Sequence, residues 1–321
     1  MSNSSDLSKD AKVVLFGAGD NGKLILKQLM SDGIMPAYFV DSNYLKLGDG
    51  VVVHDPNFLL QEDKSNLKII ITPIDSIMYA EIELQLKKMG LKECIWEPKL
   101  LCPACHNRVM KYLPYGVPQR TNAQCPYCGA VERHRAIWLY FENCTDIMSN
   151  ARKSKYNILH FAPEKVFYDK FKNMINCDYY PVDADYTMKN IRDVVDIQEL
   201  FYEDNFFDVI ICIHVLEHIP DDNRALKQLL RVLANNGVAY IDVPIYNTEK
   251  TFEDSSYNTP ELRLKYYGQE DHVRKYGKDF FEKLKRAGFN VEVIELNQNF
   301  SDEELYRYGL QRNMYLYKCY A

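Results

Sequence analysis

The stretch FDVIICIHVLEHIPDDNRALKQLLRVLANNGVAYIDVP, residues 207–244, decides the fold class. It begins with a continuous apolar run, FDVIICI, and ends with a second one, GVAYIDV. Between them, DNRALKQLLRVLA repeats apolar residues at helical spacing. A buried strand, an amphipathic helix and a second buried strand in this order predict a βαβ unit with parallel strands.

The same alternation continues on both sides of this stretch. From about residue 155, further strands are predicted in YNILHF, CDYYPVD, VEVIEL and MYLYKCY, and a helix in GKDFFEKLKRAG; we expect the final strand to be antiparallel. A smaller α/β unit, about half a full dinucleotide-binding fold, is predicted near the N-terminus. Its strands and helices are expected in KVVLF, NGKLILKQLMSDG, AYFVD, LKIIIT and SIMYAEIELQLKKMG. We therefore predict a polar tail (1–10), a Rossmann-like domain (11–99), a cysteine-rich segment with a connecting helix (100–140) and a second α/β domain (150–321).

Composition limits the class of protein. The chain has 321 residues, of which 47% are hydrophobic and 26% charged, as in ordinary globular proteins. The apolar runs are shorter than the ~18–20 residues of a membrane helix, and the polar start MSNSSDLSKD does not resemble a signal peptide. We expect a cytoplasmic protein without membrane insertion. The net charge of -6 argues against a general attraction to nucleic acid, and the sequence does not indicate an oligomeric state.

CPAC and CPYCG place Cys102, Cys105, Cys125 and Cys128 in two Cys-x-x-Cys pairs. Two such pairs can complete a tetrahedral site of four thiolates, which suits Zn²⁺. Because four cysteines leave no open coordination position, the predicted zinc is structural, with His106 and His134 as substitute ligands. The basic residues around this segment, which could contact phosphate, RNA or the other domains, are Arg108, Lys111, Arg120, Arg133 and Arg135.

The stretch 207–244 resembles the class I S-adenosylmethionine (SAM)-dependent methyltransferases. In that family a strand like FDVIIC, the following HVLEHI, a helix ending in RVL and a turn before the next strand recur together; here the turn is expected at 235–237. The segment 264–289 resembles bacterial members that also carry the cysteine ribbon and the ERHR after it. The expected fold class is therefore α/β, with a half-size Rossmann-like domain, a small zinc ribbon of four cysteines and a class I methyltransferase domain.

This resemblance implies SAM as the cofactor and assigns residues to it. The family usually ends its first strand with a glycine-rich loop, whereas NILHFAPEKVF, residues 157–167, contains no glycine. Asp183 is expected to accept hydrogen bonds from the ribose hydroxyls, with Asp185 as the alternative. Asp196 is expected at the adenine amino group and Ile197 against the ring. The remaining expected contacts are His160, Phe161, Ala162, Glu164 and His214.

Methyl transfer to a hydroxyl benefits from a general base, and histidine has a suitable pKa range. His214 and His218 flank the end of the strand FDVIICI, where the carboxyl ends of parallel strands form a ligand crevice. His272, in EDHVR, is the third candidate, with Arg274 and the insertion YNTEKTFEDSSYNTPELRLKYYG as a lid over the acceptor.

The N-terminal stretch GAGDNG, with Asp41 at the end of the next strand, predicts nucleotide binding through Gly17, Gly19, Asp20, Asn21, Gly22 and Asp41. Residues 11–99 resemble the small domain at the start of bacterial sugar O-acyltransferases, which holds a nucleotide-sugar. A mononucleotide or nucleotide-sugar is therefore expected, with NAD or no ligand as alternatives.

Together these features predict a methyltransferase that acts on a sugar hydroxyl or related small acceptor in surface-polysaccharide or nucleotide-sugar metabolism. The first alternative is an RNA methyltransferase that grips RNA with the zinc ribbon. The second is a non-catalytic nucleotide-sugar-binding protein whose methyltransferase domain is degenerate.

Overall fold

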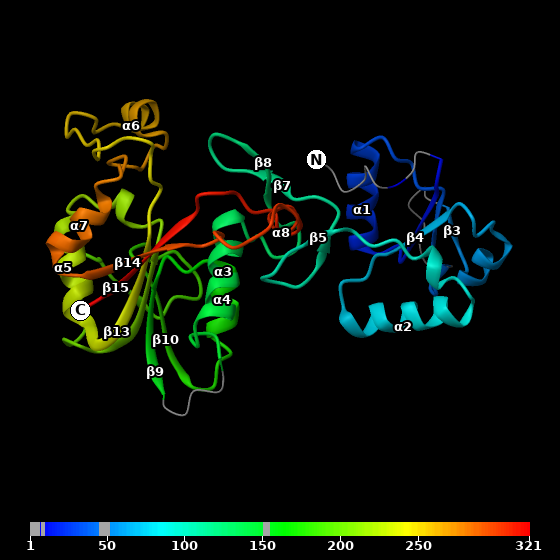
Figure 1. The fold of residues 1–321 in the computed structure, drawn as a ribbon, viewed down its shortest axis with the longest axis horizontal. Helices are drawn as coiled ribbons and strands as arrows, with labels where there is room; N and C mark the ends of the chain where they lie inside the picture. Colours follow the sequence, from blue (N-terminus) through cyan, green and yellow to red (C-terminus); the bar gives the residue numbers. More distant parts are fainter. Residues whose placement is uncertain (1–6, 8–9, 45–51, 150–154) are drawn as a thin grey trace. The chain divides into compact units, whose positions relative to one another are not determined.

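The structure, a computed structural model, describes Leu7 and residues 10–44, 52–149 and 155–321 (Figure 1). Most of the predicted polar tail lies outside these residues. The chain forms two compact units: the first contains 1–113, 125–127 and 306–309, and the second contains 114–124, 128–305 and 310–321. Among the helices of the described residues, none is long and apolar enough to cross a membrane.

A four-stranded parallel sheet in the order β3-β2-β1-β4 forms the centre of the first unit. Its strands are β1 (Lys12–Phe16), β2 (Tyr38–Val40), β3 (Val53–His54) and β4 (Leu67–Ile71). The connections contain α1 (Asp20–Ser31), η3 (Pro56–Gln61), α2 (Ser76–Lys88) and η4 (Lys92–Cys94). Apolar residues of β1 and β4 alternate between two core clusters, because successive side chains of a strand point to opposite faces.

The cysteine-rich segment contains two small two-stranded sheets. β5 (Leu100–Leu101) pairs antiparallel with β6 (Arg108–Val109), and β7 (Leu113–Tyr115) pairs with β8 (Arg120–Gln124). The turn between β5 and β6 is closed by two backbone hydrogen bonds, from Cys102 N–H to the Asn107 carbonyl and from His106 N–H to the Cys102 carbonyl.

A seven-stranded sheet in the order β11-β10-β9-β12-β13-β15-β14 forms the centre of the second unit. The strands are β9 (Tyr156–Phe161), β10 (Cys177–Asp183), β11 (Asp193–Val194), β12 (Phe207–Ile213), β13 (Leu233–Asp242), β14 (Asn290–Glu295) and β15 (Tyr315–Tyr320). β9 to β13 pair in parallel, whereas β15 is antiparallel to both β13 and β14. The predicted α/β class and the antiparallel final strand are thus confirmed.

Helices cover both faces of this sheet: in Figure 1, α5 (Asp222–Val232) and α7 (Phe280–Ala287) lie on one side and α3 (Glu132–Cys144) and α4 (Lys165–Phe171) on the other. The remaining elements are η5 (Leu216–His218), α6 (Pro260–Tyr267) and α8 (Asp302–Tyr308). Asp221 caps α5 by accepting the N–H of Arg224, and Ala225, Leu226 and Leu229 bury the apolar face that the sequence predicts.

The turn expected at 235–237 lies within the bounds of β13, and none of its three residues has a positive φ. Leu233 pairs with Phe207 and Val238 pairs with Val209, so residues 234–237 interrupt the pairing of β13 with β12. A Cβ atom on Gly237 would lie 2.8 Å from Cδ1 of Leu233 and 3.0 Å from the Phe207 carbonyl oxygen. The glycine is therefore explained by the close approach of neighbouring backbone and not by a left-handed turn.

Candidate active site

The candidate active site lies where the order of the large sheet reverses. β10 and β11 continue the sheet from β9 in one direction, and β13, β15 and β14 continue it from β12 in the other. In open α/β sheets, ligands bind outside the carboxyl ends of the strands at such a switch point. The segments that follow β9 and β12 begin at Ala162 and His214, so these segments border the expected crevice.

The loop after β9 makes a tight turn without glycine. Ala162 has φ +44°, in the left-handed region that glycine usually occupies. Its N–H donates to the carbonyl of Val182 on the neighbouring strand at 2.9 Å, and its small side chain is exposed. The backbone thus reaches the conformation that the family's glycine motif provides, at a cost in strain that a non-glycine residue carries.

His160 supports this loop from inside the domain. The residue is fully buried, with Nδ1 2.9 Å from the Tyr179 hydroxyl and Nε2 3.0 Å from Oε2 of Glu164. Burial alone would raise the pKa of Glu164, but the hydrogen bond with His160 and the nearby charges outweigh it, so this pKa lies below its usual range. Phe161 is also buried, in the apolar core of the sheet. The structure therefore brings the ring of His160 to the carboxylate of Glu164. The rings of His160 and Phe161 both lie away from solvent.

The acids expected at the ribose and adenine are near the ends of β10 and β11. Asp183 accepts the Asp185 N–H on Oδ1, while Asp185 accepts both the N–H and the hydroxyl of Thr187 on its own Oδ1. Asp196 is exposed and accepts the N–H of Gln198, and Ile197 packs in the core with 3% of its surface exposed. Of the two candidates for the ribose, Asp183 is the one at a strand end.

His214 follows β12 and stands between two carboxylates. Its backbone has φ +53°, and its N–H donates to the carbonyl of Asp242 at 2.9 Å. Nδ1 lies 3.1 Å from Oε1 of Glu217, and Nε2 lies 3.5 Å from Oδ2 of Asp242. Burial raises the pKa of Asp242 to about 6 although the charge of His214 opposes the shift. Burial would also raise the pKa of Glu217, but the contact with His214 lowers it below its usual range.

Arg133 and Asp242 are site residues that the sequence analysis did not assign. Arg133 projects from α3 and lines, with His214 and Asp242, a cavity of about 860 Å³. Its Nε is buried and has no hydrogen-bond partner among the described residues. The neighbouring His134 lies 3.6 Å from Oε1 of Glu164, and burial lowers its pKa to about 3, so its ring is neutral. The ERHR stretch was the available signal, although it was interpreted as part of the ribbon surface.

The cavity itself is lined by polar and aromatic side chains in addition to these three. They are Tyr246, Asn247, Lys278, Phe281, Asn313, Tyr315 and Tyr317, with aliphatic residues between them. A concave site with an apolar body and a few charged groups is the usual form of a small-molecule site.

The other two candidate histidines meet beside His214. The rings of His218 and His272 are 4.6 Å apart between centroids at an interplanar angle of 88°, and His272 is buried. Arg274, expected in a lid, is instead 1% exposed and donates to the carbonyls of Leu216, Ile219 and Pro220. Its guanidinium also makes two bonds to Glu253. Arg274 therefore connects the segment around His272 to the loop that carries Glu217 and His218.

Contacts within the first unit hold the glycine loop in place. Asp41 accepts the N–H groups of Ala18 and Asn43, so its carboxylate braces the loop. A Cβ atom on Gly22 would lie 2.2 Å from the Gly17 carbonyl oxygen, which explains Gly22 by loop–helix packing. Gly19 precedes α1 without a side-chain cap, and Asp20 begins the helix.

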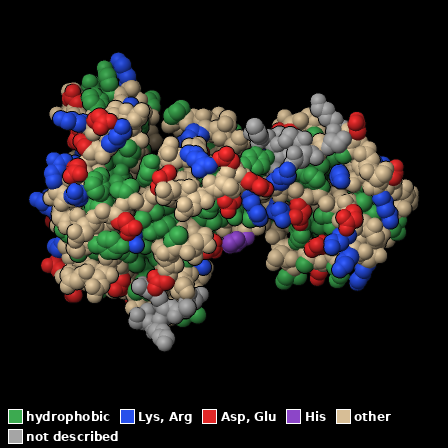
Figure 2. Space-filling view, in the orientation of Figure 1, with side chains coloured by type: hydrophobic (Ala, Val, Ile, Leu, Met, Phe, Trp, Pro, Cys, Tyr) green, Lys and Arg blue, Asp and Glu red, His purple; other side chains and the backbone are tan. Residues whose placement is uncertain are grey.

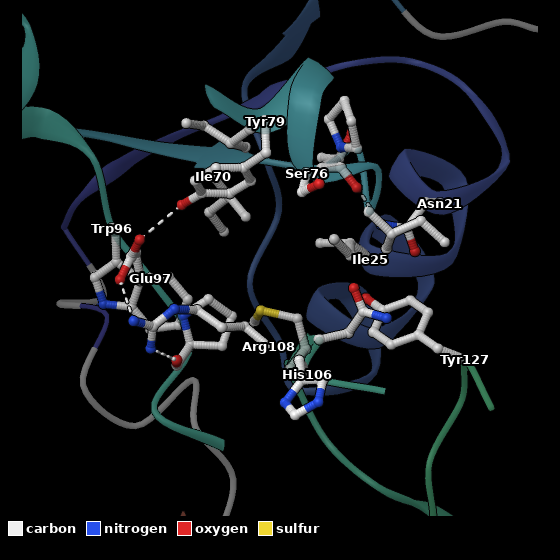
Figure 3. Close-up of a pocket in the computed structure, with 17 residues that line it drawn as sticks. Asn21, Ile25, Ile70, Ser76, Tyr79, Trp96, Glu97, His106, Arg108 and Tyr127 are labelled. Carbon is white, nitrogen blue, oxygen red and sulfur yellow. Dashed lines mark hydrogen bonds and ion pairs between the residues drawn. The ribbon is translucent and has the colours of Figure 1, made fainter. Parts of the chain in front are cut away.

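A cavity of about 250 Å³ lies on another side of this loop (Figure 3). Of the residues expected to bind a nucleotide, Asn21 alone lines it, from α1. In Figure 3, Tyr79, Glu97 and Arg108 form a chain of contacts along one wall: the Tyr79 hydroxyl is 2.7 Å from Glu97, which is 2.7 Å from Arg108. His106 and Tyr127 project toward the opposite wall.

The four predicted zinc ligands are brought together. The Sγ atoms of Cys102, Cys105, Cys125 and Cys128 all lie within 4.8 Å of one another, and those of Cys105 and Cys125 are 3.8 Å apart. Four sulfur atoms at ~2.3 Å from a tetrahedral ion are separated by about 3.8 Å, so the cluster fits Zn²⁺. His106 and His134 are not members of the cluster.

Comparison with known proteins identifies one part of the chain. Residues 159–294 match the model of the family described as "Methyltransferase domain". The solved structures that match the chain include a SAM-dependent methyltransferase from Archaeoglobus fulgidus (13% identity, 59% of this chain and 94% of that chain, TM-score 0.39). Another is an S-adenosylmethionine-dependent methyltransferase from Mesorhizobium loti (17% identity, 52% and 90%, TM-score 0.38). No curated protein matches the sequence. The family match thus falls within the second unit, from β9 into β14, and this part of the Rossmann-like sheet is similar to a methyltransferase domain.

Proposed function

We propose that the chain transfers a methyl group from SAM to a hydroxyl of a sugar or related small acceptor, in cytoplasmic nucleotide-sugar or surface-polysaccharide metabolism. The observation that carries this proposal is His214, placed at the sheet's switch point between Glu217 and Asp242 and on the wall of the cavity of about 860 Å³. The methyltransferase family match includes His214, Glu217 and Asp242.

The residues around the switch point suit the parts of SAM, which supplies an electrophilic methyl group on a sulfonium. Ala162 gives the tight turn that lets backbone approach the ligand, and Asp183 offers a carboxylate to the ribose hydroxyls. Asp196 and Ile197 are proposed for the adenine. The buried, unpartnered Nε of Arg133 suits the methionine carboxylate, because a guanidinium binds a carboxylate with charge-assisted hydrogen bonds.

His214 is proposed as the general base. The carboxylate of Glu217 favours a proton on Nδ1, which leaves Nε2 to accept the proton of the acceptor hydroxyl. The acceptor oxygen forms a bond to the methyl carbon while the bond from that carbon to sulfur breaks. The cavity contributes alignment of the two reactants and exclusion of water.

The contacts of the basic residues near the ribbon do not favour the RNA alternative. Arg108 pairs with Glu97, Lys111 with Asp32 and Arg120 with Glu132. Arg135 is fully buried and donates to the carbonyls of Ala123 and Ala130. On the face shown in Figure 2, Lys and Arg side chains are interspersed with Asp and Glu. Three of these cations are paired with carboxylates and Arg135 is buried, so these four do not form an open phosphate-binding surface.

The other parts are proposed as supports for this reaction. Residues 100–140 would bind one structural Zn²⁺ through the four cysteines, which fit it in distance. Residues 11–99 would bind a nucleotide or nucleotide-sugar, and 150–321 would carry the chemistry. The open N-terminus of α1 supports an anionic ligand at the glycine loop, since helix N–H groups and the helix dipole favour phosphate.

The first experiment is calorimetric titration of the full chain with SAM, S-adenosylhomocysteine, NAD and RNA, followed by transfer of labelled methyl from SAM to a panel of UDP-, GDP- and dTDP-sugars. We expect binding of SAM and its product, and label in a sugar nucleotide. Absence of SAM binding would overturn the proposed activity. Label that enters RNA and not the sugars would favour the RNA alternative, and SAM binding without transfer to either class would overturn the proposed acceptor.

A further inference from the structure

Beside His214 lies a group of side chains that general-base catalysis does not explain. Glu217, His218 and His272 each offer one potential metal-ligand atom, and the three atoms all lie within 4.8 Å of one another. Glu217 and His272 are 0% and 2% exposed, while His218 is half-buried. Ligand atoms around one cation at ~2.0–2.2 Å are separated by at most about 4.4 Å, so small movements complete the arrangement.

The polar atoms of this cluster lack the partners that burial requires. Both carboxylate oxygens of Glu217 and Nδ1 of His272 are buried without a hydrogen bond among the described residues. Oε1 of Glu217 is near His214, at 3.1 Å, but without the geometry of a hydrogen bond. His214 compensates the charge of Glu217 on one side, and a cation would give a partner to the second carboxylate oxygen and to Nδ1 of His272.

The two segments that carry the cluster are fixed to each other. The N–H of Val273 donates to the carbonyl of Glu217 at 2.9 Å, and Arg274 holds the three carbonyls of the 216–220 loop. Nδ1 of His218 lies 3.2 Å from Oδ2 of Asp271. A carboxylate on one ring nitrogen is the usual device that orients a histidine whose other nitrogen binds metal. The cluster is therefore preorganised by contacts that are independent of any ligand.

We propose that Glu217, His218 and His272 bind one divalent metal ion beside the reaction centre, separate from the cysteine cluster. Two imidazoles and a carboxylate suit Mn²⁺, Fe²⁺ or Zn²⁺ better than Mg²⁺, which prefers oxygen ligands. Three protein ligands leave coordination positions open, as in catalytic and not structural sites. The partly exposed side of His218 provides the entry path.

The role of this ion rests on the proposed methyl transfer, whereas its binding does not. A cation held by Glu217, His218 and His272 would act as a Lewis acid and lower the pKa of an acceptor hydroxyl. The proton passes to Nε2 of His214, and the oxygen's electron pair forms the bond to the methyl carbon. The carbon–sulfur electron pair returns to sulfur, which leaves as a neutral thioether. A ligand with two adjacent hydroxyls fits best, because it can fill two open positions.

The test is titration of the full, zinc-loaded chain with Mn²⁺, followed by the electron paramagnetic resonance signal of free Mn²⁺. Neither SAM nor acceptor is present, so the result does not depend on the proposed activity. Mn²⁺ is the probe because it disfavours the thiolate cluster. We expect saturable binding of one ion per chain. Glu217→Gln, which keeps the side-chain shape, and His272→Gln should each weaken it by at least ~100-fold, since loss of an outer-shell partner alone costs 10–100-fold.

His218→Gln gives the same test at a half-exposed position, and Asp271→Asn should weaken binding by about 10-fold. The matched control is Glu199→Gln, an exposed carboxylate paired with Arg224, which should bind Mn²⁺ like the wild type. Far-UV circular dichroism establishes that each variant is folded. Absence of saturable Mn²⁺ binding to the folded wild type would overturn the proposal. Equal affinity in the wild type and a folded His218→Gln or His272→Gln chain would overturn it as well.

Discussion

Replacement of Asp242 by Asn should stabilise the protein at neutral pH and less so in acid. Asp242 is 9% exposed at the end of β13, and burial raises its pKa from 3.8 to about 6. A carboxyl group whose folded pKa lies above the unfolded value binds its proton more tightly in the folded state. The contribution of Asp242 to the free energy of unfolding is therefore fully present below pH 3.8 and is lost as the pH rises through about 6.

The size of the effect follows from the shift of about two pKa units. At pH 7.5, ionised Asp242 destabilises the folded state by about 3 kcal/mol, because each unit corresponds to ~1.4 kcal/mol. At pH 5.0 the folded group is protonated and the cost is about 1.6 kcal/mol. Asn carries no charge at either pH. The difference in free energy of unfolding between Asp242→Asn and the wild type should thus grow by about 1.4 kcal/mol, in favour of the variant, from pH 5.0 to pH 7.5.

The assay is urea unfolding followed by the fluorescence of Trp138, which is buried in α3 and stacks on Phe167 at 6.0 Å between ring centroids. A Trp96→Phe background removes the second tryptophan, so the signal reports the second unit. Asp204→Asn is the control, because its side chain is 67% exposed and should give no such pH dependence. If the difference between Asp242→Asn and the wild type were the same at both pH values, the assigned burial cost would be refuted.

Three further predictions concern the site. His214→Ala should reduce turnover by ~10²-fold or more while SAM affinity in calorimetry stays near the wild-type value, and unchanged turnover would remove His214 from the mechanism. Asp183→Asn should weaken SAM binding by ~10–100-fold through loss of charged hydrogen bonds. Asp185→Asn should weaken SAM binding less, because Oδ1 of Asp185 already accepts hydrogen bonds from Thr187. The reverse order of the two effects would assign the ribose to Asp185. Arg274→Met should cost about 3–5 kcal/mol in urea unfolding because it removes the buried guanidinium from the carbonyls of Ile219 and Pro220 and from Glu253. Exposed Arg224→Met should cost ~1 kcal/mol or less, and equal costs would contradict this role of Arg274.

The strands of the second unit were predictable because each is a continuous apolar run that a parallel sheet buries on both faces. CDYYPVD corresponds to β10, Cys177–Asp183, and FDVIICI to β12, Phe207–Ile213. At 235–237 the pairing is interrupted but the left-handed conformation is absent, because a glycine can serve close backbone packing as well as positive φ. The glycine-free loop shows the converse, since Ala162 takes a conformation that its residue type does not predict.

The site was less predictable because its charges come from distant segments. Arg133 and Asp242 line one cavity only once α3 and the end of β13 are placed in the same fold. Periodicity identifies an element's buried face but does not say which elements meet. For the same reason, His160 was expected as a cofactor contact, whereas its ring bonds to Tyr179 and Glu164 inside the domain.

Arg274 holds the segment that carries His272 against the 216–220 loop, whereas the exposed part of the insertion is not held in this way. The insertion after β13 returns at Tyr276, where Ile245 pairs with it, and Lys275 exchanges backbone hydrogen bonds with Phe252. Arg274 and Val273 then attach the returning chain to the 216–220 loop. Because these contacts are made by backbone or by one buried guanidinium, substitutions in the exposed part of the insertion leave His272 beside Glu217. Under the proposed function, substitutions at Tyr246 and Asn247, which line the cavity, would change acceptor specificity without movement of His214 and Glu217.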